Sequence, residues 1–269
     1  HDGATTTTTS RVILKFKKSA QKGAFFVFYS LIYIMKKFYL LLLVLLIVSC
    51  DKKTQITITK VIGSPQYPNA KISLNDPLIV DEGYNFSFNV SGYKLGMPTL
   101  KDFDYQLANS AKGQHIHFIV NNGPYSAHYD DTFTKKFKDE NNVILAFLSR
   151  SYHESVKNPN AFVLTQIGEN NIDLSSEFLF YSRPKGKYKD RDTEKLLLDF
   201  YLINTEISSS GNKVRATIQD TEFIIDEWSP YYIEGLQKGE VKIKLELIDS
   251  SGFLIDTPFN PSERTVILE

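Results

Sequence analysis

The sequence predicts an all-β protein built from two tandem immunoglobulin-like β-sandwich domains. Three observations predict this fold. Short stretches of alternating apolar and polar residues recur from Ile56 onward, turn-forming residues separate them, and the stretches repeat at a nearly constant spacing. Alternation with a period of two is typical of strands with one buried face, and short strands separated regularly by turns indicate a sandwich.

The composition is that of a globular protein and excludes several functional classes. The 269 residues are 42% hydrophobic and 23% charged, which excludes collagen-like and wholly disordered chains. A single cysteine excludes a disulfide framework and any zinc or iron–sulfur site with several cysteine ligands. The net charge of zero excludes a strongly basic nucleic-acid-binding protein, so we expect no nucleic-acid partner.

Residues 35–49 have the pattern of a bacterial lipoprotein signal peptide. Lys36 and Lys37 form a positive region, and an apolar run of eleven residues, 38–48, follows them. Eleven residues suit a signal peptide, whereas a transmembrane helix needs about 20. The alternative is a longer signal anchor over 25–48, but its two lysines would lie in mid-membrane at about 2.5–3.5 kcal/mol each.

Cys50 is the predicted lipidation site. Ser49 precedes it, as in the bacterial lipobox, where a small residue stands before the cysteine that is lipidated and becomes the new N-terminus. Residues 50–55 are expected to form a polar tether. Two or more acyl chains hold a protein stably at a membrane. We therefore expect an extracytoplasmic protein anchored to the bacterial cell envelope, with the outer membrane as the expected location; an ordinary buried thiol is the alternative for Cys50.

Residues 1–34 are expected to be an upstream segment that is not part of the natural product. The chain starts with His1, and Met35 stands directly before the positive region. The first 49 residues hold seven basic residues and one acidic residue, which leaves 24 basic and 30 acidic residues and a net charge of −6 for the remainder. A mildly acidic body is not expected to bind nucleic acid or anionic membranes by charge.

Strands and turns can be placed along this body. Alternation is clearest in residues 85–90, 115–120 and 241–247. Gly and Pro punctuate the chain too often for long helices, and they predict turns at 122–124, 184–186 and 250–252. Residues 195–202 would suit a helix by their charges and leucines, but the internal repeat favours a strand there.

An offset of 98 residues aligns the two halves of the body. Gly113 then meets Gly211, and apolar residues meet apolar residues at Ile116–Val214, Val120–Ile218, Tyr125–Phe223, Val143–Val241, Leu145–Ile243 and Phe147–Leu245. Upstream, residues 103–107 align with 198–202 at an offset of 95, and 85–88 align with 177–180. Internal similarity at a fixed spacing indicates repeated structural units.

Two domains of about 100 residues follow from this repeat. We expect domain 1 over residues 56–168 and domain 2, its internal repeat, over residues 169–269. A length near 100 residues suits a seven-stranded immunoglobulin-like sandwich. The alternative is one larger sandwich or barrel.

The repeat also predicts two histidines on the outer face of domain 1. In domain 2, the strand over 213–218 must turn its apolar residues inward, because Lys213 and Arg215 are costly to bury. By register, His115 and His117 take the outward positions in domain 1. Residues at i and i+2 of a strand lie on one face, about 6.6 Å apart, so these two histidines can share a metal ion.

The candidate metal ligands are the four histidines of the body. They all fall in domain 1, at His115, His117, His128 and His153. Imidazole nitrogens suit zinc or copper. The alternative is that these are ordinary surface histidines in a strand and two loops.

A second candidate site is the polar loop that follows a buried strand at 149–155. Its candidate ligand-binding residues are Arg150, Tyr152, His153 and Glu154, which could bind a peptide, a glycan or an anion. The alternative is a loop capped by its own Ser and Glu side chains. No nucleophile elbow or oxyanion hole accompanies the serines and histidine of this loop, so we expect no catalytic residues and no enzyme.

Several segments of the body resemble a family of small bacterial envelope lipoproteins. They are residues 113–118, 122–125, 146–155, 180–186 and 256–261. The resemblance covers most of residues 60–269. Members are usually called hypothetical proteins and sometimes phosphopeptide-binding proteins, and the resemblance implies no established activity. The phosphopeptide label would require clustered cations, for which the chain offers Arg150, Arg183, Arg191, Arg215 and Arg264.

The sequence thus predicts a lipid-anchored, extracytoplasmic binding protein without catalytic activity. Its ligand would lie on the histidine-bearing face of domain 1. The expected partners are the membrane, through Cys50, and a protein, peptide or glycan. No cofactor is expected apart from zinc or copper under the metal hypothesis, in which His115 and His117 act with His128 or His153. Binding of a phosphopeptide or anion by Arg150 and its neighbours is the other alternative.

Overall fold

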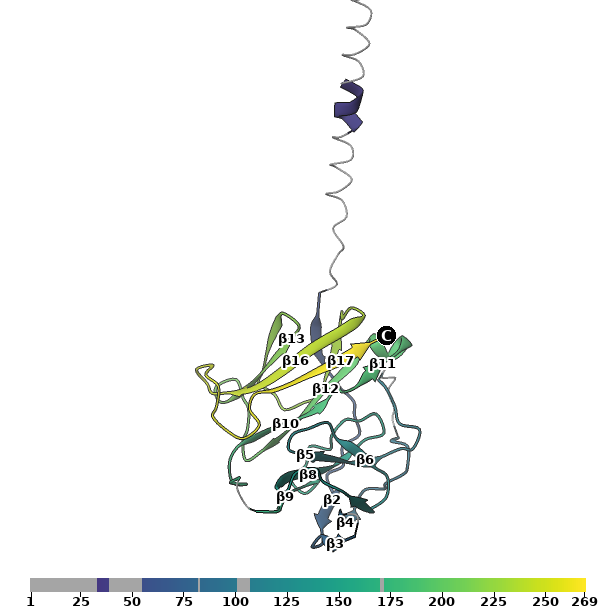
Figure 1. The fold of residues 1–269 in the computed structure, drawn as a ribbon, viewed down its shortest axis with the longest axis vertical. Coiled ribbons are helices and arrows are strands. Elements are labelled where there is room, and N and C mark those ends of the chain that lie inside the picture. Colours follow the sequence, from purple (N-terminus) through teal and green to yellow (C-terminus); the bar gives the residue numbers. More distant parts are fainter. Residues whose placement is uncertain (1–32, 39–54, 82, 101–106, 170–171) are drawn as a thin grey trace, which may run out of the picture. The chain divides into compact units, whose positions relative to one another are not determined.

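The computed structural model describes residues 33–38, 55–81, 83–100, 107–169 and 172–269 (Figure 1). The chain divides into two units, His1–Lys53 and Thr54–Glu269. In the first unit, the described residues 33–38 are helical. No helix in the described ranges has the length and the apolar character that crossing a membrane requires.

The predicted N-terminal features lie mostly outside the described residues. This applies to most of the signal peptide over 35–49, to Cys50 and to residues 51–54 of the tether. It applies equally to nearly all of the upstream segment 1–34. Lipidation and location therefore stay predictions, and the account below concerns the second unit.

The first sandwich packs two sheets face to face. In one sheet, β4 (Gly83–Ser91) pairs with β2 (Lys71–Leu74), β3 (Leu78–Val80) and β7 (Thr132–Lys135). The other sheet has the order β6-β5-β8-β9, with β6 at Ser126–His128, β5 at His115–Val120, β8 at Asn142–Ser149 and β9 at Phe162–Ile167. Phe86 and Phe88 of β4 pack against Ile116 and Phe118 of β5 in the core between them.

The second sandwich is built in the same way. One sheet has the order β1-β15-β12-β10, with β1 at Thr57–Lys60, β15 at Tyr231–Glu234, β12 at Leu196–Ile203 and β10 at Phe178–Arg183. The other has the order β11-β17-β16-β13-β14, with β11 at Lys187–Tyr188, β17 at Ser262–Leu268, β16 at Gly239–Ile248, β13 at Lys213–Ile218 and β14 at Thr221–Ile225. A 3-10 turn, η1 (Asp190–Thr193), follows β11. The predicted all-β fold of two tandem sandwiches is confirmed.

The same four-strand arrangement occurs in both sandwiches. β5 pairs with β6 and β8, and β8 with β9, just as β13 pairs with β14 and β16, and β16 with β17. The bounds of β5 and β13 differ by 98 residues, the offset of the predicted repeat.

The two upstream alignments of that repeat are wrong. Strand β4 pairs with β2 and β7 as β12 pairs with β10 and β15, so β4 is the counterpart of β12. The alignment of 85–88 with 177–180 instead matches β4 with β10. The alignment of 103–107 with 198–202 makes a segment other than β4 the counterpart of β12. Residues 103–106 of that segment lie outside the described residues. Aromatic alternation is common to most strands of a sandwich, so it does not distinguish one strand from the next.

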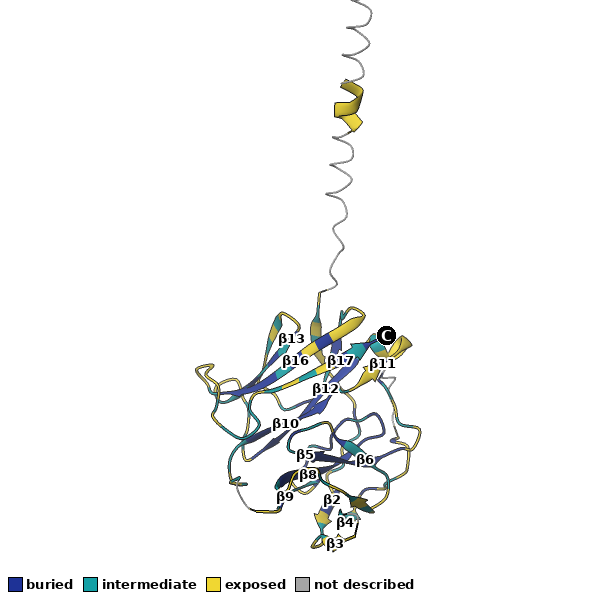
Figure 2. Ribbon diagram, viewed as in Figure 1, coloured by how far each residue is buried: buried dark blue, intermediate teal, exposed yellow. Residues whose placement is uncertain are grey.

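The sandwiches are stacked through a third apolar layer. Residues of β5 and β8, among them Ile119, Leu145 and Phe147, pack against Phe180 of β10 and Tyr201 of β12. As a result, β8, β10 and β12 are buried along their whole length (Figure 2). β1, which precedes the first sandwich in the chain, pairs with β15 of the second sandwich. The sheet that carries the two histidines therefore has a covered outer face.

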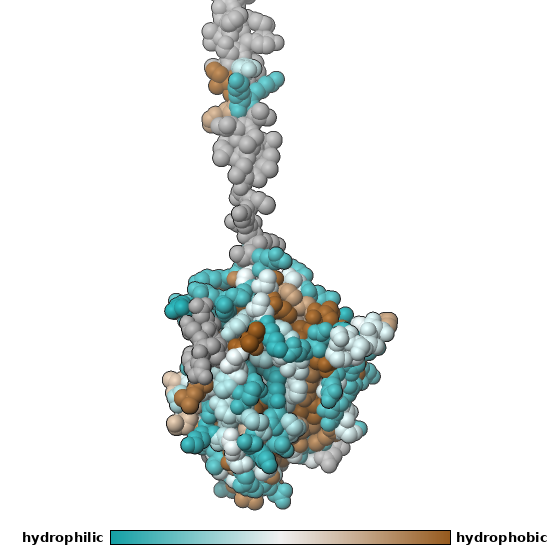
Figure 3. Space-filling model, turned by 180° about the vertical axis from the view of Figure 1, so that it is seen from behind, coloured by the Kyte–Doolittle hydropathy of each residue, from teal (hydrophilic) through white to brown (hydrophobic). Residues whose placement is uncertain are grey.

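The outer surface of the body is mixed in character. Hydrophilic residues are interspersed with apolar ones on the face shown in Figure 3. Several large apolar side chains are exposed, among them Ile79 of β3 and Phe253 after β16. Scattered exposed apolar residues are normal at the surface of a folded domain.

Candidate metal centre

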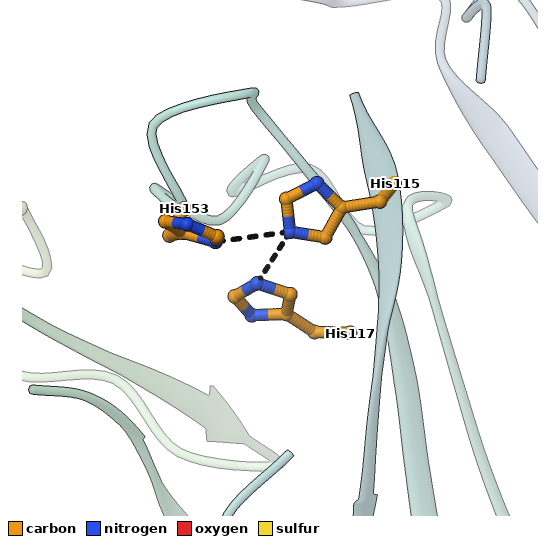
Figure 4. A group of neighbouring side chains, drawn as sticks. All are labelled: His115, His117 and His153. Atoms are coloured by element: carbon orange, nitrogen blue, oxygen red, sulfur yellow. Dashed lines mark hydrogen bonds between the residues drawn. The ribbon is translucent and has the colours of Figure 1, made fainter. Parts of the chain in front are cut away.

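Three histidines converge in the first sandwich (Figure 4). One nitrogen from each of His115, His117 and His153 lies within 4.8 Å of the other two. His115 Nε2 is at the centre, 3.0 Å from His117 Nε2 and 3.1 Å from His153 Nδ1. Three of the four predicted metal ligands are thus brought together.

Strand β5 positions the first two rings. Side chains alternate along a strand, so His115 and His117 share the face opposite Ile116 and Phe118, as the repeat predicts. The prediction that this face is exposed is wrong: both histidines are completely buried. The reason is the second sandwich, whose Ser182 places its hydroxyl 3.4 Å from His117 Nδ1.

A tight turn after β8 positions the third ring. The His153 backbone N–H donates to the Arg150 carbonyl at 2.8 Å, and His153 has a φ of 72°. This left-handed conformation is uncommon for residues other than glycine. The second sandwich has the same turn after β16, where Gly252 donates to Asp249 and has a φ of 87°. The left-handed conformation turns the His153 side chain towards His115.

The predicted ligand-binding loop is the support of this turn. Arg150 Nη1 lies 2.9 Å from Glu154 Oε1, and both side chains are nearly completely buried. The Arg150 guanidinium also donates to the carbonyls of Pro65 and Ser155. Tyr152 donates to Ser64, which in turn donates to Glu154. Arg150, Tyr152 and Glu154 are therefore engaged internally, and their arrangement matches the alternative of a self-capped loop.

A shallow cavity of about 390 Å³ adjoins this loop. Arg150, Glu154 and Lys157 contribute to its lining, together with Trp228 of the second sandwich. Lys157 forms an ion pair with the buried Asp199, and Arg150 with Glu154. These lining cations already have carboxylate partners, which disfavours the predicted phosphopeptide site at Arg150.

The fourth candidate ligand, His128, lies apart from the other three. It stands opposite Ile116 in the β5–β6 pairing, and directly opposed residues share a face of the sheet. His128 therefore points to the inner face of the first sandwich, where it stacks on Phe133 with ring centroids 3.4 Å apart. Its Nε2 is 2.8 Å from the Ser126 hydroxyl. The predicted grouping of His128 with His115 and His117 is wrong, because the pairing places His128 on the other side of the sheet.

The backbone near Gly113 selects the tautomer of His115. His115 Nδ1 lies 2.8 Å from the Gly113 carbonyl, so this nitrogen carries the proton and donates it. In a neutral imidazole the other nitrogen then has a free lone pair, and here that nitrogen is the central Nε2. Histidines that bind metals commonly donate their second nitrogen to a carbonyl in this way.

Burial keeps the three rings neutral. It lowers the pKa of His115 to about 4, with a further contribution from the cations Arg183 and Lys185. The same causes lower the pKa of His117 and His153 well below the usual value. Neutral imidazole is the form that binds metal ions. His153 is half-buried, so the cluster has one ring in contact with solvent.

Residues that sequence reasoning did not assign to a site surround the cluster. The Tyr125 hydroxyl lies 3.1 Å from His153 Nδ1, and the Tyr125 ring stacks on His117 with centroids 3.5 Å apart. Arg183, the last residue of β10, and Lys185, two residues after it, lie over the Tyr125 ring. Gly113, Tyr125 and Arg183 all fall in segments that carry the lipoprotein resemblance. Their position in these segments is the one sequence signal that could have assigned them to the site. Only the stacking of the sandwiches brings the segments together.

Comparisons with known proteins add little to this site. No family model matches the chain, and no curated protein matches it. Among solved structures, fibronectin(III)-like modules of CbhA from Clostridium thermocellum are similar at 12% identity and a TM-score of 0.27, covering 80% of this chain and 94% of that one. The central fibronectin-III array of RIM-binding protein is similar at 10% identity and a TM-score of 0.24, covering 78% and 72%. Likeness at this level carries no functional conclusion.

Proposed function

We propose that this protein binds one zinc or copper ion through His115, His117 and His153, and that it does so as a lipid-anchored protein of the bacterial cell envelope. The observation that carries the proposal is the grouping of three imidazole nitrogens within 4.8 Å of one another, two of them on completely buried rings. The anchor rests on the signal-peptide pattern and on Cys50. The activity is binding, with no catalytic step.

The spacing of the nitrogens supports a shared ion. Zinc–nitrogen bonds of 2.0–2.1 Å in a tetrahedral site place two ligand nitrogens about 3.3 Å apart. The separations of 3.0 Å and 3.1 Å around His115 Nε2 are close to this value. The nitrogens of His117 and His153 lie within 4.8 Å of each other, so these two rings would have to turn towards each other to bind an ion.

Hydrogen bonding alone satisfies this arrangement poorly. Because His115 Nε2 has a single lone pair, it accepts one hydrogen bond well, yet His117 and His153 both face it. A cation that accepts all three lone pairs removes this conflict. Three protein ligands leave one position of a four-coordinate site for a further ligand.

The test is calorimetric titration of Thr54–Glu269, which forms one compact unit, with zinc and with copper(II). We expect one ion per chain with a Kd in the micromolar range or tighter. His153→Asn is the decisive variant, because Asn tolerates a positive φ while its side chain is a poor substitute for imidazole. We expect it to weaken binding at least tenfold.

His128→Asn is the matched control, since His128 lies on the other face of the sheet. It should bind with unchanged stoichiometry and affinity. Binding that is absent in the unmodified chain, or equally strong in His153→Asn, would refute the proposed centre. Metabolic labelling with a radioactive fatty acid, lost in Cys50→Ser, tests the anchor separately.

A further inference from the structure

Resting on this proposed metal function, we infer that Tyr125 supplies a fourth ligand as its phenolate and that the resident ion is copper(II). The inference starts from position. The Tyr125 hydroxyl is 3.1 Å from His153 Nδ1, the same spacing that separates the imidazole nitrogens from one another. Tyr125 is nearly completely buried, and its ring lies parallel to that of His117, with 13° between the planes.

The charges around the centre call for an anionic ligand. The Arg183 guanidinium carbon is 5.5 Å from the centroid of the Tyr125 ring, and Lys185 Nζ is 3.8 Å from it. Among the described residues, no carboxylate forms an ion pair with either cation. A divalent ion held by three neutral imidazoles would add two positive charges beside two existing ones. Repulsion of that kind is strong where water is excluded.

Arg183 is the residue that points most directly to an anion at Tyr125. It is 7% exposed, and its Nε has no hydrogen-bond partner, although Nη1 donates to the Tyr188 hydroxyl at 2.7 Å. Buried guanidinium groups are normally paired with an anion. Burial raises the pKa of the Tyr125 hydroxyl above its usual value in the metal-free chain, so the phenolate would form only together with the bond to the ion. It would then supply the missing negative charge beside Arg183.

The binding step is balanced without a further reactant. The Tyr125 O–H bond breaks, its oxygen forms a bond to the copper(II) ion, and the proton passes to the buffer. No electron is transferred. A hard, anionic oxygen added to three imidazoles favours copper(II) over the softer copper(I), and copper(II) binds nitrogen and oxygen ligands more tightly than zinc does.

The test is absorption spectroscopy of Thr54–Glu269 titrated with copper(II). Phenolate ligation produces an intense phenolate-to-copper charge-transfer band in the visible region, which imidazole ligands alone do not produce. We expect this band in the unmodified chain. In Tyr125→Phe, which keeps the ring stacked on His117, the band should vanish and the copper(II) affinity should fall at least tenfold.

Tyr129→Phe is the matched control. The Tyr129 ring lies 5.0 Å from that of His115, but its hydroxyl bonds to Ser110 at 2.7 Å. Its band and affinity should be unchanged. If the unmodified chain binds copper without the band, and Tyr125→Phe binds equally well, the role of Tyr125 is overturned while the three-histidine site stands. If the unmodified chain binds neither ion, the proposed function itself fails.

Discussion

Strands β5 and β13 occupy the same place in the two sandwiches, yet their outer faces have opposite environments. In β13 the outer positions hold Lys213 and Arg215, which remain partly exposed; Arg215 pairs with Glu246 at 2.9 Å. In β5 the same positions hold His115 and His117, which are completely buried. The sheet of β10 and β12 covers β5, whereas the outer face of β13 remains open to solvent.

The turns that follow β8 and β16 differ in a parallel way. Gly252 occupies the left-handed position in one, without steric cost, and His153 occupies it in the other. The repeat therefore shows which features are generic to the fold. At three of these equivalent positions the first sandwich carries a histidine, His115, His117 and His153, and these three side chains meet. We conclude that a surface position becomes a candidate site when a neighbouring domain covers it.

The largest expected change in stability comes from placing on the outer face of β5 a positive charge like those on the outer face of β13. His117→Lys would place an ammonium group in a buried position that already faces Arg183 and Lys185. Fully burying a lysine shifts its pKa by 3 units or more, so we expect a loss of about 4 kcal/mol in unfolding free energy. Urea denaturation of the metal-free chain measures it.

Arg215→Lys in β13 is the control for that experiment. It keeps the charge at an accessible position, and it should cost less than about 1 kcal/mol. A loss of similar size in the two variants would contradict the difference in burial between the two strands.

The next effect is stabilisation by the metal. A ligand at one hundred times its Kd stabilises the native state by about 2.7 kcal/mol. Copper(II) or zinc should therefore raise the thermal unfolding temperature of Thr54–Glu269. In His153→Asn, the unfolding temperature should no longer respond to metal, while the metal-free stability changes by less than about 1 kcal/mol. An equal rise in both proteins would show that the ion binds elsewhere.

The smallest expected effect is the contribution of His115 alone to the acid destabilisation of the metal-free chain. Burial lowers the pKa of His115 to about 4 in the folded state, against about 6.5 when unfolded. Below pH 6.5 the unfolded state binds more protons, so stability is present above that pH and is lost as the pH falls towards 4. His115 alone should cost about 2 kcal/mol at pH 4.5.

Denaturation midpoints at pH 7 and pH 4.5, in the presence of a chelator, test this prediction. β13 contains no histidine, so we expect the histidine-dependent loss of stability to arise in the first sandwich. His128→Gln should reduce the loss only in part, because His128 also has a pKa lowered to about 4 by burial. Equal midpoints at the two pH values would mean that the histidines are not buried as described.

Much of the fold could be predicted because strand patterns are local. The offset of 98 residues placed β5 against β13 and correctly assigned His115 and His117 to one face, opposite Ile116 and Phe118. The runs in β8 and β12 carried a further signal. Val143–Leu148 and Leu196–Leu198 are continuously apolar, a pattern typical of strands covered on both faces. Read in that way, they would have indicated a covered sheet.

The site itself could be predicted only in part. The sequence offers no ground for separating His128 from the other three histidines, because the β5–β6 register that places it on the other face depends on the turn geometry at 121–125. The sequence predicts ligand binding by Arg150 and Glu154, but their partners Pro65 and Ser64 lie about 85–90 residues away in the chain. Distant contacts of this kind leave no periodic trace in the sequence.

The sequence by itself determined the strands, the repeat of two domains and the face of β5 that bears the histidines. It also predicts the N-terminal signal peptide. These depend on alternation and turn chemistry within a few residues. Only the tertiary structure decided that this face is buried, that the turn at His153 reaches it, and that Tyr125 and Arg183 surround the cluster. The physical reason is that burial depends on which sheets stack against each other. That stacking brings residues near His115 close to residues near Arg183, and no local sequence pattern relates these two segments.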